Sequence, residues 1–366
     1  MNVFAAIAHD MNVLKYFKDR TKEHLKTLRF LARVVIPIIL RTRSRPVLFL
    51  RYVGMGDIIC TFPAVEQLKK QYPKRAFIYS CYPEFICLPK MAGITSNVAN
   101  LRGDIIQTYW SFLFASIYAF QHDRLPDPRV PGDVGSEVSV IEDFGRQFGV
   151  KTGDSHPRLL VEPAVLNRVK SLLEKQGSRQ ESLIIIHCGP SWRVREFPYE
   201  SWARLIQGLR ARGFTNIVQL GTSDHSCLGS VGSMVFPNVV SFVDQLSLEE
   251  SIALISLSRL FIGIDSGLLH VAASLRTSGV GIFGATSPQY RFSKTSSCTF
   301  VFSDLECQGC HHRKPRLHFE SGCPFDIACM TTLPVERVLA ECLSKLNALP
   351  SDLAQLGAFD RGTGIE

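Results

Sequence analysis

The sequence predicts an α/β protein with two domains, each a parallel sheet covered by helices. Short apolar runs of strand length alternate with amphipathic stretches of helix length, and this alternation starts at residue 47 and again at residue 183. Strands that alternate with helices form parallel sheets with right-handed crossovers. Two such halves predict two Rossmann-like domains that face a cleft, with ligands at the carboxyl ends of the strands.

The first series begins with the apolar strand 47–50, which leads through a glycine-rich turn into a helix. A strand over 76–80, an aromatic-rich helix over 107–120 and a Pro- and Gly-rich loop over 125–135 follow. The linker lies near 161–180 and contains a helix across 165–174. The second series predicts strand 183–186, a helix from Pro198, strands 216–220 and 239–243, helix 248–257, strand 260–264, helix 267–275 and strand 280–283.

These elements predict four parts of the chain. They are a basic helical extension over 1–46, a first domain over 47–175, a second domain over 176–345 and a tail over 346–366. We expect the first domain to hold the acceptor of the reaction described below, and the second to hold its donor.

Composition excludes a disordered chain and a membrane-spanning segment near the start. Of 366 residues, 46% are hydrophobic, which is enough to bury a sizeable core. The apolar run 30–40 is broken by Arg33 and Pro37 and is too short to span a bilayer. No signal peptide is evident, because no cleavage site of small residues follows the first apolar patch. The sequence therefore predicts a cytoplasmic protein.

The formal net charge of +8 is concentrated at the start of the chain. Residues 1–46 hold ten Lys or Arg and three Asp or Glu. The remaining residues hold 31 basic and 30 acidic side chains and are therefore nearly neutral. Within this part, residues 11–35 have the apolar spacing of an amphipathic helix. This helix either lies on an anionic inner-membrane surface or docks on its own domain. The neutral body, without a basic and aromatic stripe, argues against a nucleic-acid partner.

The first candidate site is the turn Gly54-Met55-Gly56-Asp57. Glycine at position 56 lets the backbone approach a ligand closely. Asp57, at the start of the following helix, faces the cleft and is placed to take a proton from an incoming hydroxyl, the role of a general base. The alternative is that Asp57 merely caps the helix. The turn is not the dinucleotide fingerprint, because Ile59 stands where that motif has its last glycine.

Two further turns follow strands of the second series. In the first, Ser191 and backbone amides are placed to bind phosphate oxygens, and Arg195 to offset charge on a leaving diphosphate. The alternative is a solvated arginine, but two arginines in one loop, Arg193 and Arg195, favour anion binding. In the second, Asp265 and Ser266 cap a helix, while Gly267 removes bulk where a ligand approaches. His270 shares the ligand-facing side of that helix, or else is a satisfied core residue.

These motifs resemble those of the bacterial heptosyltransferases, glycosyltransferase family nine. The resemblance covers residues 47–345, roughly, and rests on three segments that occur in the family's order and spacing. They are Gly56-Asp57-Ile58-Ile59-Cys60-Thr61-Phe62-Pro63-Ala64, residues 187–198, and Asp265-Ser266-Gly267-Leu268-Leu269-His270-Val271-Ala272-Ala273. The resemblance implies a GT-B fold and an inverting transfer of heptose from ADP-heptose to a lipopolysaccharide core acceptor.

The same resemblance implies roles for individual residues. Asp57 becomes the base, with Gly56 beside it; Arg195 and Ser191 contact the donor phosphates; Asp265, Ser266, Gly267, Leu268 and His270 hold nucleotide and diphosphate. Asp224 lies near a family Glu that binds the ribose of the adenosine, and its side chain is shorter than that Glu. No catalytic metal is needed, because fixed positive groups take over that role. The start His187-Cys188-Gly189-Pro190 and the basic extension depart from the family pattern.

Four cysteines cluster late in the chain, at 307, 310, 323 and 329. Cys307 and Cys310 have the spacing of a metal knuckle. The resemblance leaves two interpretations, because protein-heptosylating relatives bind iron at four cysteines whereas many others carry no metal. The cluster Cys307, Cys310, Cys323 and Cys329 therefore either holds a structural Zn or Fe or consists of reduced structural thiols.

Two other functions stay open on the sequence. One is a transferase of the same fold that uses another nucleotide sugar or heptosylates a protein, which the cysteines favour. The other is a non-catalytic protein that binds nucleic acid or metal.

Overall fold

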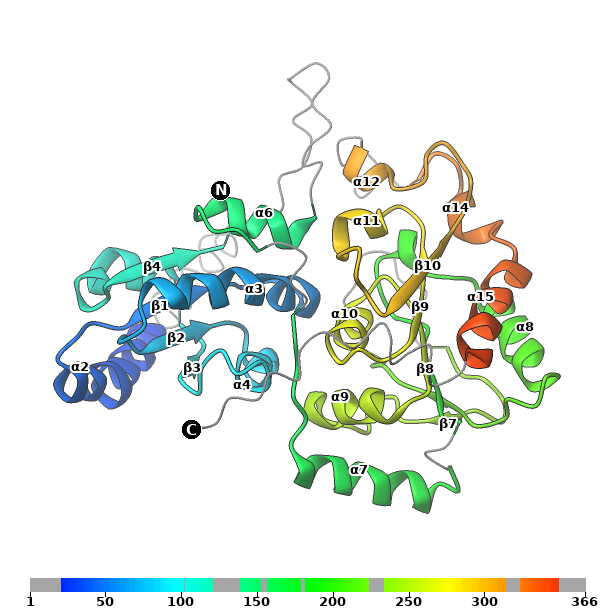
Figure 1. The fold of residues 1–366 in the computed structure, drawn as a ribbon, viewed down its shortest axis with the longest axis horizontal. Coiled ribbons are helices and arrows are strands. Elements are labelled where there is room, and N and C mark those ends of the chain that lie inside the picture. The colour runs from blue at the N-terminus through cyan, green and yellow to red at the C-terminus, as the bar shows by residue number, and fades with distance from the viewer. Residues whose placement is uncertain are drawn as a thin grey trace, which may run out of the picture.

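The computed structural model describes residues 21–101, 103–120, 139–152, 157–178, 182–223, 234–313 and 323–348. These residues form two lobes that lie side by side, each built on a parallel sheet (Figure 1). The first sheet has the strand order β3-β2-β1-β4, and the second has the order β10-β9-β8-β5-β6-β7. The predicted α/β class with two parallel sheets is therefore confirmed.

The first sheet is built around β1 (Val47–Leu50), whose residues are all buried. β1 pairs with β2 (Phe77–Ser80) on one side and β4 (Ser116–Ala119) on the other, and β2 pairs with the short β3 (Val98–Ala99). Helices of this lobe are α3 (Met55–Gln71), α4 (Cys87–Met91), α5 (Gly103–Ile105) and α6 (Val140–Gln147). Strand β1 leads directly into α3, as the sequence predicts.

The helix predicted over 107–120 is wrong in its second half. Helix α5 continues as a π-helical turn (Ile106–Trp110) and a 3₁₀ turn (Ser111–Leu113), and the chain then forms β4. Residues 116–120 contain the β-branched Ile117 and the aromatic Tyr118 and Phe120, which fit a strand. The open edge of β1 accepts that strand, so pairing in the sheet outweighs the helical spacing.

The amino-terminal extension packs against the first sheet. Residues 21–30 are helical, and a π-helical turn (Leu31–Val35) and α2 (Ile36–Thr42) continue the helix beyond the predicted end. Leu31, Val35 and Ile38 are buried in one cluster with Leu48 and Ile78 of the sheet. Of the two alternatives for this helix, docking on its own domain is confirmed for residues 31–38, while residues 1–20 lie outside the described residues. No helix in the described ranges is long and apolar enough to span a bilayer.

The second lobe follows the predicted order of elements from the linker helix onward. Its strands are β5 (Ile184–His187), β6 (Ile217–Gln219), β7 (Val240–Ser241), β8 (Leu260–Ile264), β9 (Gly279–Phe283) and β10 (Cys298–Phe302). Its helices are α7 (Pro163–Lys175), α8 (Tyr199–Arg210), α9 (Leu248–Leu257), α10 (Gly267–Ser274), α11 (Pro288–Arg291), α12 (Cys310–Arg313), α14 (Ala328–Thr331) and α15 (Val335–Asn347). Strand β10 and the helices α11, α12, α14 and α15 are not among the predicted elements.

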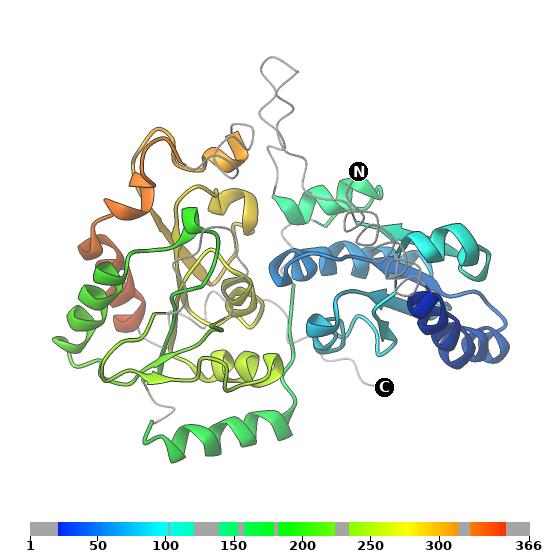
Figure 2. The ribbon, with the colours of Figure 1, turned by 180° about the vertical axis from the view of Figure 1, so that it is seen from behind.

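The lobes meet where α3 packs against α10, as both ribbon views show (Figures 1 and 2). Glycines make this contact possible. A Cβ atom at Gly267 would lie 2.5 Å from the Met55 side chain, and one at Gly56 would lie 2.5 Å from the ring of His270. The amino-terminal ends of two helices that follow strands, β1 and β8, therefore come together at the junction. The domain boundaries at 46, 175 and 345 stay predictions.

Candidate active site between the two lobes

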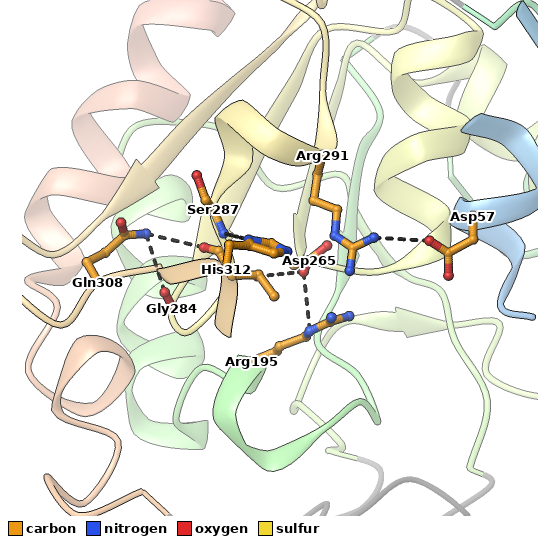
Figure 3. Close-up of polar contacts among 9 residues, drawn as sticks. Asp57, Arg195, Asp265, Gly284, Ser287, Arg291, Gln308 and His312 are labelled. Carbon is orange, nitrogen blue, oxygen red and sulfur yellow. Dashed lines mark hydrogen bonds and ion pairs between the residues drawn. The ribbon is translucent and has the colours of Figure 1, made fainter. Parts of the chain in front are cut away.

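Asp57 lies in the first turn of α3 and points across the junction. Its Oδ1 accepts a hydrogen bond of 3.0 Å from Nη1 of Arg291, the last residue of α11 in the second lobe. The Asp57 side chain is 26% exposed and the Arg291 side chain 9%. Figure 3 shows the guanidinium of Arg291 between Asp57 and Asp265. The predicted base therefore lies neither in bulk solvent nor in a core, but at the contact between lobes.

Asp265 follows β8 and anchors the cluster on the second lobe. Its Oδ2 lies 3.2 Å from Nε of Arg195, which belongs to the 3₁₀ turn after β5, and accepts a hydrogen bond of 2.6 Å from Thr286. Burial by itself raises the pKa of Asp265, but Arg195, Arg291 and the Thr286 hydroxyl outweigh it and hold the pKa at about 2. Asp265 is therefore ionised at neutral pH, where it pairs with Arg195 and attracts Arg291 electrostatically.

The loop after β5 gives Arg195 a defined direction. Its guanidinium lies over the ring of Trp192, 4.1 Å from the ring centre. The backbone N–H of Ser191 donates to Oε1 of the buried Glu196 at 3.0 Å, which fixes the shape of the loop. Both predicted phosphate-binding residues, Ser191 and Arg195, thus lie on the turn that ends β5, close to the Asp265 turn that ends β8.

Helix α10 begins at this cluster with Ser266 as its N-cap residue. The Ser266 side chain makes no capping hydrogen bond. Its buried Oγ has no hydrogen-bond partner among the described residues. A buried hydroxyl without a partner at a helix amino terminus suits a ligand that accepts hydrogen bonds, because the first amides of the helix also lack partners there. Gly267 and Leu268 supply those amides.

His270 lies deeper in the junction than the other predicted ligand-binding residues. Its ring stacks on Phe292 with centroids 4.3 Å apart, and its Nδ1 lies 3.6 Å from Sγ of Cys60. Burial lowers the pKa of His270 to about 4, against the opposing effect of Asp265, so the ring is neutral at pH 7. The structure thus places His270 within the packing of α10 against α3, and its predicted role in binding stays a prediction.

The predicted ribose contact Asp224 lies outside the described residues. The loop just before it contains Ser223, whose backbone N–H donates to both carboxylate oxygens of Asp244 at 3.0 and 3.1 Å. Hydrogen bonds from Ser223 and Thr222 lower the pKa of Asp244. Asp244 follows β7, and only the sheet topology brings it to this loop.

The four late cysteines surround one small apolar pocket, which Val194, Ala285, Phe325, Ile327 and Ala328 complete. Burial raises the pKa of the Cys329 thiol to about 12, and the other three cysteines add to this effect. Within the ranges that the structure describes, no three His, Cys, Asp or Glu residues have an arrangement that holds a metal ion. Thiols are the donors that Zn or Fe prefers, but the geometry does not supply a coordination sphere. A bound metal therefore stays a prediction.

Sequence reasoning did not single out Arg291, which contacts the predicted base. Its signal was weak, because a one-turn helix separates it from the polar loop that ends at Pro288. Only the packing of the lobes shows that this arginine reaches Asp57.

Comparisons with known proteins point to one family. The model of the family "Glycosyltransferase family 9 (heptosyltransferase)" matches residues 110–319. Lipopolysaccharide heptosyltransferase 3 of Escherichia coli is 27% identical over 209 residues, 54% of this chain and 57% of the relative. Lipooligosaccharide heptosyltransferase 2 of Haemophilus influenzae is 28% identical over 156 residues, 40% of this chain and 44% of the relative. The alignments thus span about half the length of these curated relatives.

Solved structures share the fold. A family 9 glycosyl transferase from Veillonella parvula has a TM-score of 0.62 at 13% identity and covers 82% of this chain and 97% of its own. The iron-containing dodecameric glycosyltransferase TibC from enterotoxigenic Escherichia coli has a TM-score of 0.62 at 17% identity, covering 84% and 80%. ADP-heptose lipopolysaccharide heptosyltransferase II of Escherichia coli has a TM-score of 0.56 at 15% identity, covering 86% and 100%. Because the family model matches more than half of the residues of this chain, the chain belongs to glycosyltransferase family 9, the heptosyltransferases.

Proposed function

We propose that this chain is an inverting glycosyltransferase that moves a heptose from ADP-heptose to a lipopolysaccharide core acceptor. The observation that carries the proposal is the arrangement of charges at the junction. A carboxylate from the first lobe, Asp57, lies against a second-lobe cluster with Arg195 and Arg291 beside the start of α10. A family member with a base on one lobe and phosphate-binding groups on the other has the parts for sugar transfer.

In the proposed reaction, Asp57 accepts the proton of the acceptor hydroxyl. The hydroxyl oxygen forms a bond to the anomeric carbon, on the face opposite the diphosphate, and the bond from that carbon to the diphosphate oxygen breaks. The electron pair of the broken bond leaves with ADP. Attack from the opposite face inverts the anomeric configuration.

The leaving ADP carries negative charge that the second lobe must stabilise. Arg195, fixed by Asp265 and stacked on Trp192, supplies a positive charge with little freedom to move. The amino terminus of α10 adds the backbone amides of Gly267 and Leu268 together with the Ser266 hydroxyl. Groups that are fixed before the reaction stabilise developing charge without reorganising, so they replace a catalytic metal ion.

A donor and acceptor screen tests the proposal. The full chain is incubated with ADP-heptose or other nucleotide sugars and with a heptose-deficient core acceptor, and the products are identified by mass spectrometry. A mass increase of one heptose, with release of ADP, is the expected result. Transfer from another nucleotide sugar only would replace the proposed donor.

A protein acceptor is the second candidate, and the four cysteines around one pocket favour it. TibC, which shares the fold, is an iron-containing heptosyltransferase that binds ADP-D-β-D-heptose. The same screen with protein acceptors distinguishes the two candidates. Elemental analysis of the purified chain tests the accompanying metal: about one equivalent of Zn or Fe is expected if the cysteines hold it, and less than a tenth contradicts it.

The extension gives the enzyme a surface for an anionic membrane, on the cytoplasmic side of the inner membrane. The helix over 21–42 buries one face on the first sheet and exposes another that carries Leu25, Leu28, Ile36 and Leu40. Basic residues also lie exposed along this helix, namely Lys22, Lys26, Arg29, Arg33 and Arg41. An apolar stripe with neighbouring cations binds at the headgroup boundary of anionic lipid.

A further inference from the structure

Arg291 makes a polar contact across the junction to the proposed base. It donates from Nη1 to Oδ1 of Asp57 at 3.0 Å, and its own side chain is 9% exposed. In the described part of the chain, Oδ2 of Asp57 has no hydrogen-bond partner. One oxygen of the carboxylate is therefore held, while the other is left for a substrate proton.

The residue after Arg291 contacts the residue before Asp57 through one intermediate ring. Phe292 stacks on His270, and His270 lies against Gly56, where no Cβ atom would fit. Arg291 thus contacts Asp57 directly, and the next residue, Phe292, contacts Gly56 through the ring of His270. Because packing and the ion pair fix the same turn of α3, the direction of the Asp57 side chain depends on contact between the lobes.

Arg291 is itself held from the second lobe. It lies beside Asp265, whose carboxylate it helps to keep ionised, and α11 places it at the end of a single helical turn. Arg195 contacts Oδ2 of the same carboxylate through its Nε. The two arginines therefore differ in direction: Arg195 stays within the second lobe, whereas Arg291 reaches into the first (Figure 3).

We propose that Arg291 is a positioning residue for the transfer reaction. By binding Oδ1 of Asp57 across the junction, it turns Oδ2 toward the acceptor hydroxyl, so the base has its working direction only when the lobes are in contact. This assignment rests on the function proposed above. In the transfer step the hydroxyl proton goes to Oδ2, and Arg291 keeps its own protons throughout.

A double-mutant cycle with Asp57→Asn and Arg291→Gln tests the assignment in the full chain. Arg291→Gln should lower kcat about 100-fold, because a misdirected catalytic group costs about that much. The affinity for ADP, measured by calorimetry, should change less than about twofold, since the donor site is intact. In the Asp57→Asn background, Arg291→Gln should lower the residual rate by less than about twofold, because a residue that acts only through Asp57 has nothing left to position.

Conservative and control variants complete the experiment. Arg291→Lys keeps a charge but lacks the planar fork, so it should recover about a tenth of the wild-type kcat. If Arg291→Gln fails to fold, Arg291→Lys replaces it in the double-mutant cycle. Arg337→Gln removes an exposed arginine paired with Asp304 and should leave kcat unchanged.

The outcomes separate this assignment from the proposed function. Losses that multiply in the double mutant, or a large loss of ADP affinity in Arg291→Gln, would overturn the assignment and make Arg291 a direct ligand of the donor phosphates. A wild-type chain that transfers no sugar would overturn the proposed function and the assignment with it. Losses of kcat that do not multiply in the double mutant, together with an unchanged affinity for ADP, support both the assignment of Arg291 and the proposed function.

Discussion

The two lobes each present an aspartate just after a parallel strand, but their surroundings differ. Asp265 on the second lobe is 3% exposed and contacts Arg195 and Thr286. Asp57 on the first lobe is 26% exposed and contacts Arg291 through one oxygen. A carboxylate whose partners surround it acts as an anchor for cations, whereas one with an open oxygen can exchange a proton with a substrate. The same residue type after the same kind of strand is thus suited to two different purposes.

Replacing the open aspartate should have the largest effect on activity. Asp57→Asn removes the base and keeps the shape, so kcat should fall about 1,000-fold, within the range for general-base removal. Donor affinity should remain close to wild type, since the phosphate-binding groups lie on the other lobe. Steady-state kinetics and ADP calorimetry provide the measurement. Asp104→Asn, in the first turn of α5, is the matched control; a large loss of ADP affinity in Asp57→Asn would contradict the assigned role.

Replacing the buried aspartate should instead reduce stability. Asp265→Asn leaves Arg195 and Arg291 with less compensating charge in a buried site, so the free energy of unfolding should fall by about 3 kcal/mol. Asp57→Asn should lower it by less than about 1 kcal/mol, because its pair is partly exposed. Urea unfolding of both variants checks the contrast. Equal losses would mean that the two carboxylates do not differ in the way proposed.

Acid should weaken the junction between the lobes through His270. Its pKa is lowered from 6.5 to about 4 in the folded chain, mainly by burial. As the pH falls, His270 is therefore protonated in the unfolded chain before it is protonated in the folded chain. The stability that depends on neutral His270 is complete above pH 6.5 and is lost toward pH 4. When the pH is lowered from 7 to 5, the titration of His270 should reduce the free energy of unfolding by about 2 kcal/mol. His270→Gln should reduce the pH dependence of urea unfolding by that amount; an unchanged slope would exclude His270 as its source.

The basic helix of the first lobe should produce the smallest effect, on location rather than chemistry. Replacing Leu25, Ile36 and Leu40 by Ser should reduce binding to phosphatidylglycerol vesicles about tenfold, because exposed apolar side chains no longer enter the interface. Flotation with neutral phosphatidylcholine vesicles is the control for charge. Turnover with a soluble acceptor fragment should not change. Equal flotation of both proteins would limit the helix to its docking role.

Local patterns predicted most of the fold because strands and helices of this class have distinct periods. Strand 260–264 and helix 248–257 were predicted at the bounds that the structure shows. Strand β4 lies within the predicted helix 107–120, because only the tertiary structure places its four residues beside the open edge of β1. The three motif turns were found for a similar reason: glycine, proline and capping residues mark the ends of strands in any chain of this class.

The sequence by itself determined the alternation of strands and helices, the family and the identity of Asp57, Arg195 and Asp265 as candidates. The tertiary structure decided which aspartate is enclosed and which is open, and that Arg291 reaches the first lobe. The physical reason is that hydrophobic period and turn chemistry are local properties, written in neighbouring residues. Burial and ion pairing between residues 234 positions apart arise only when α3 and α10 pack together.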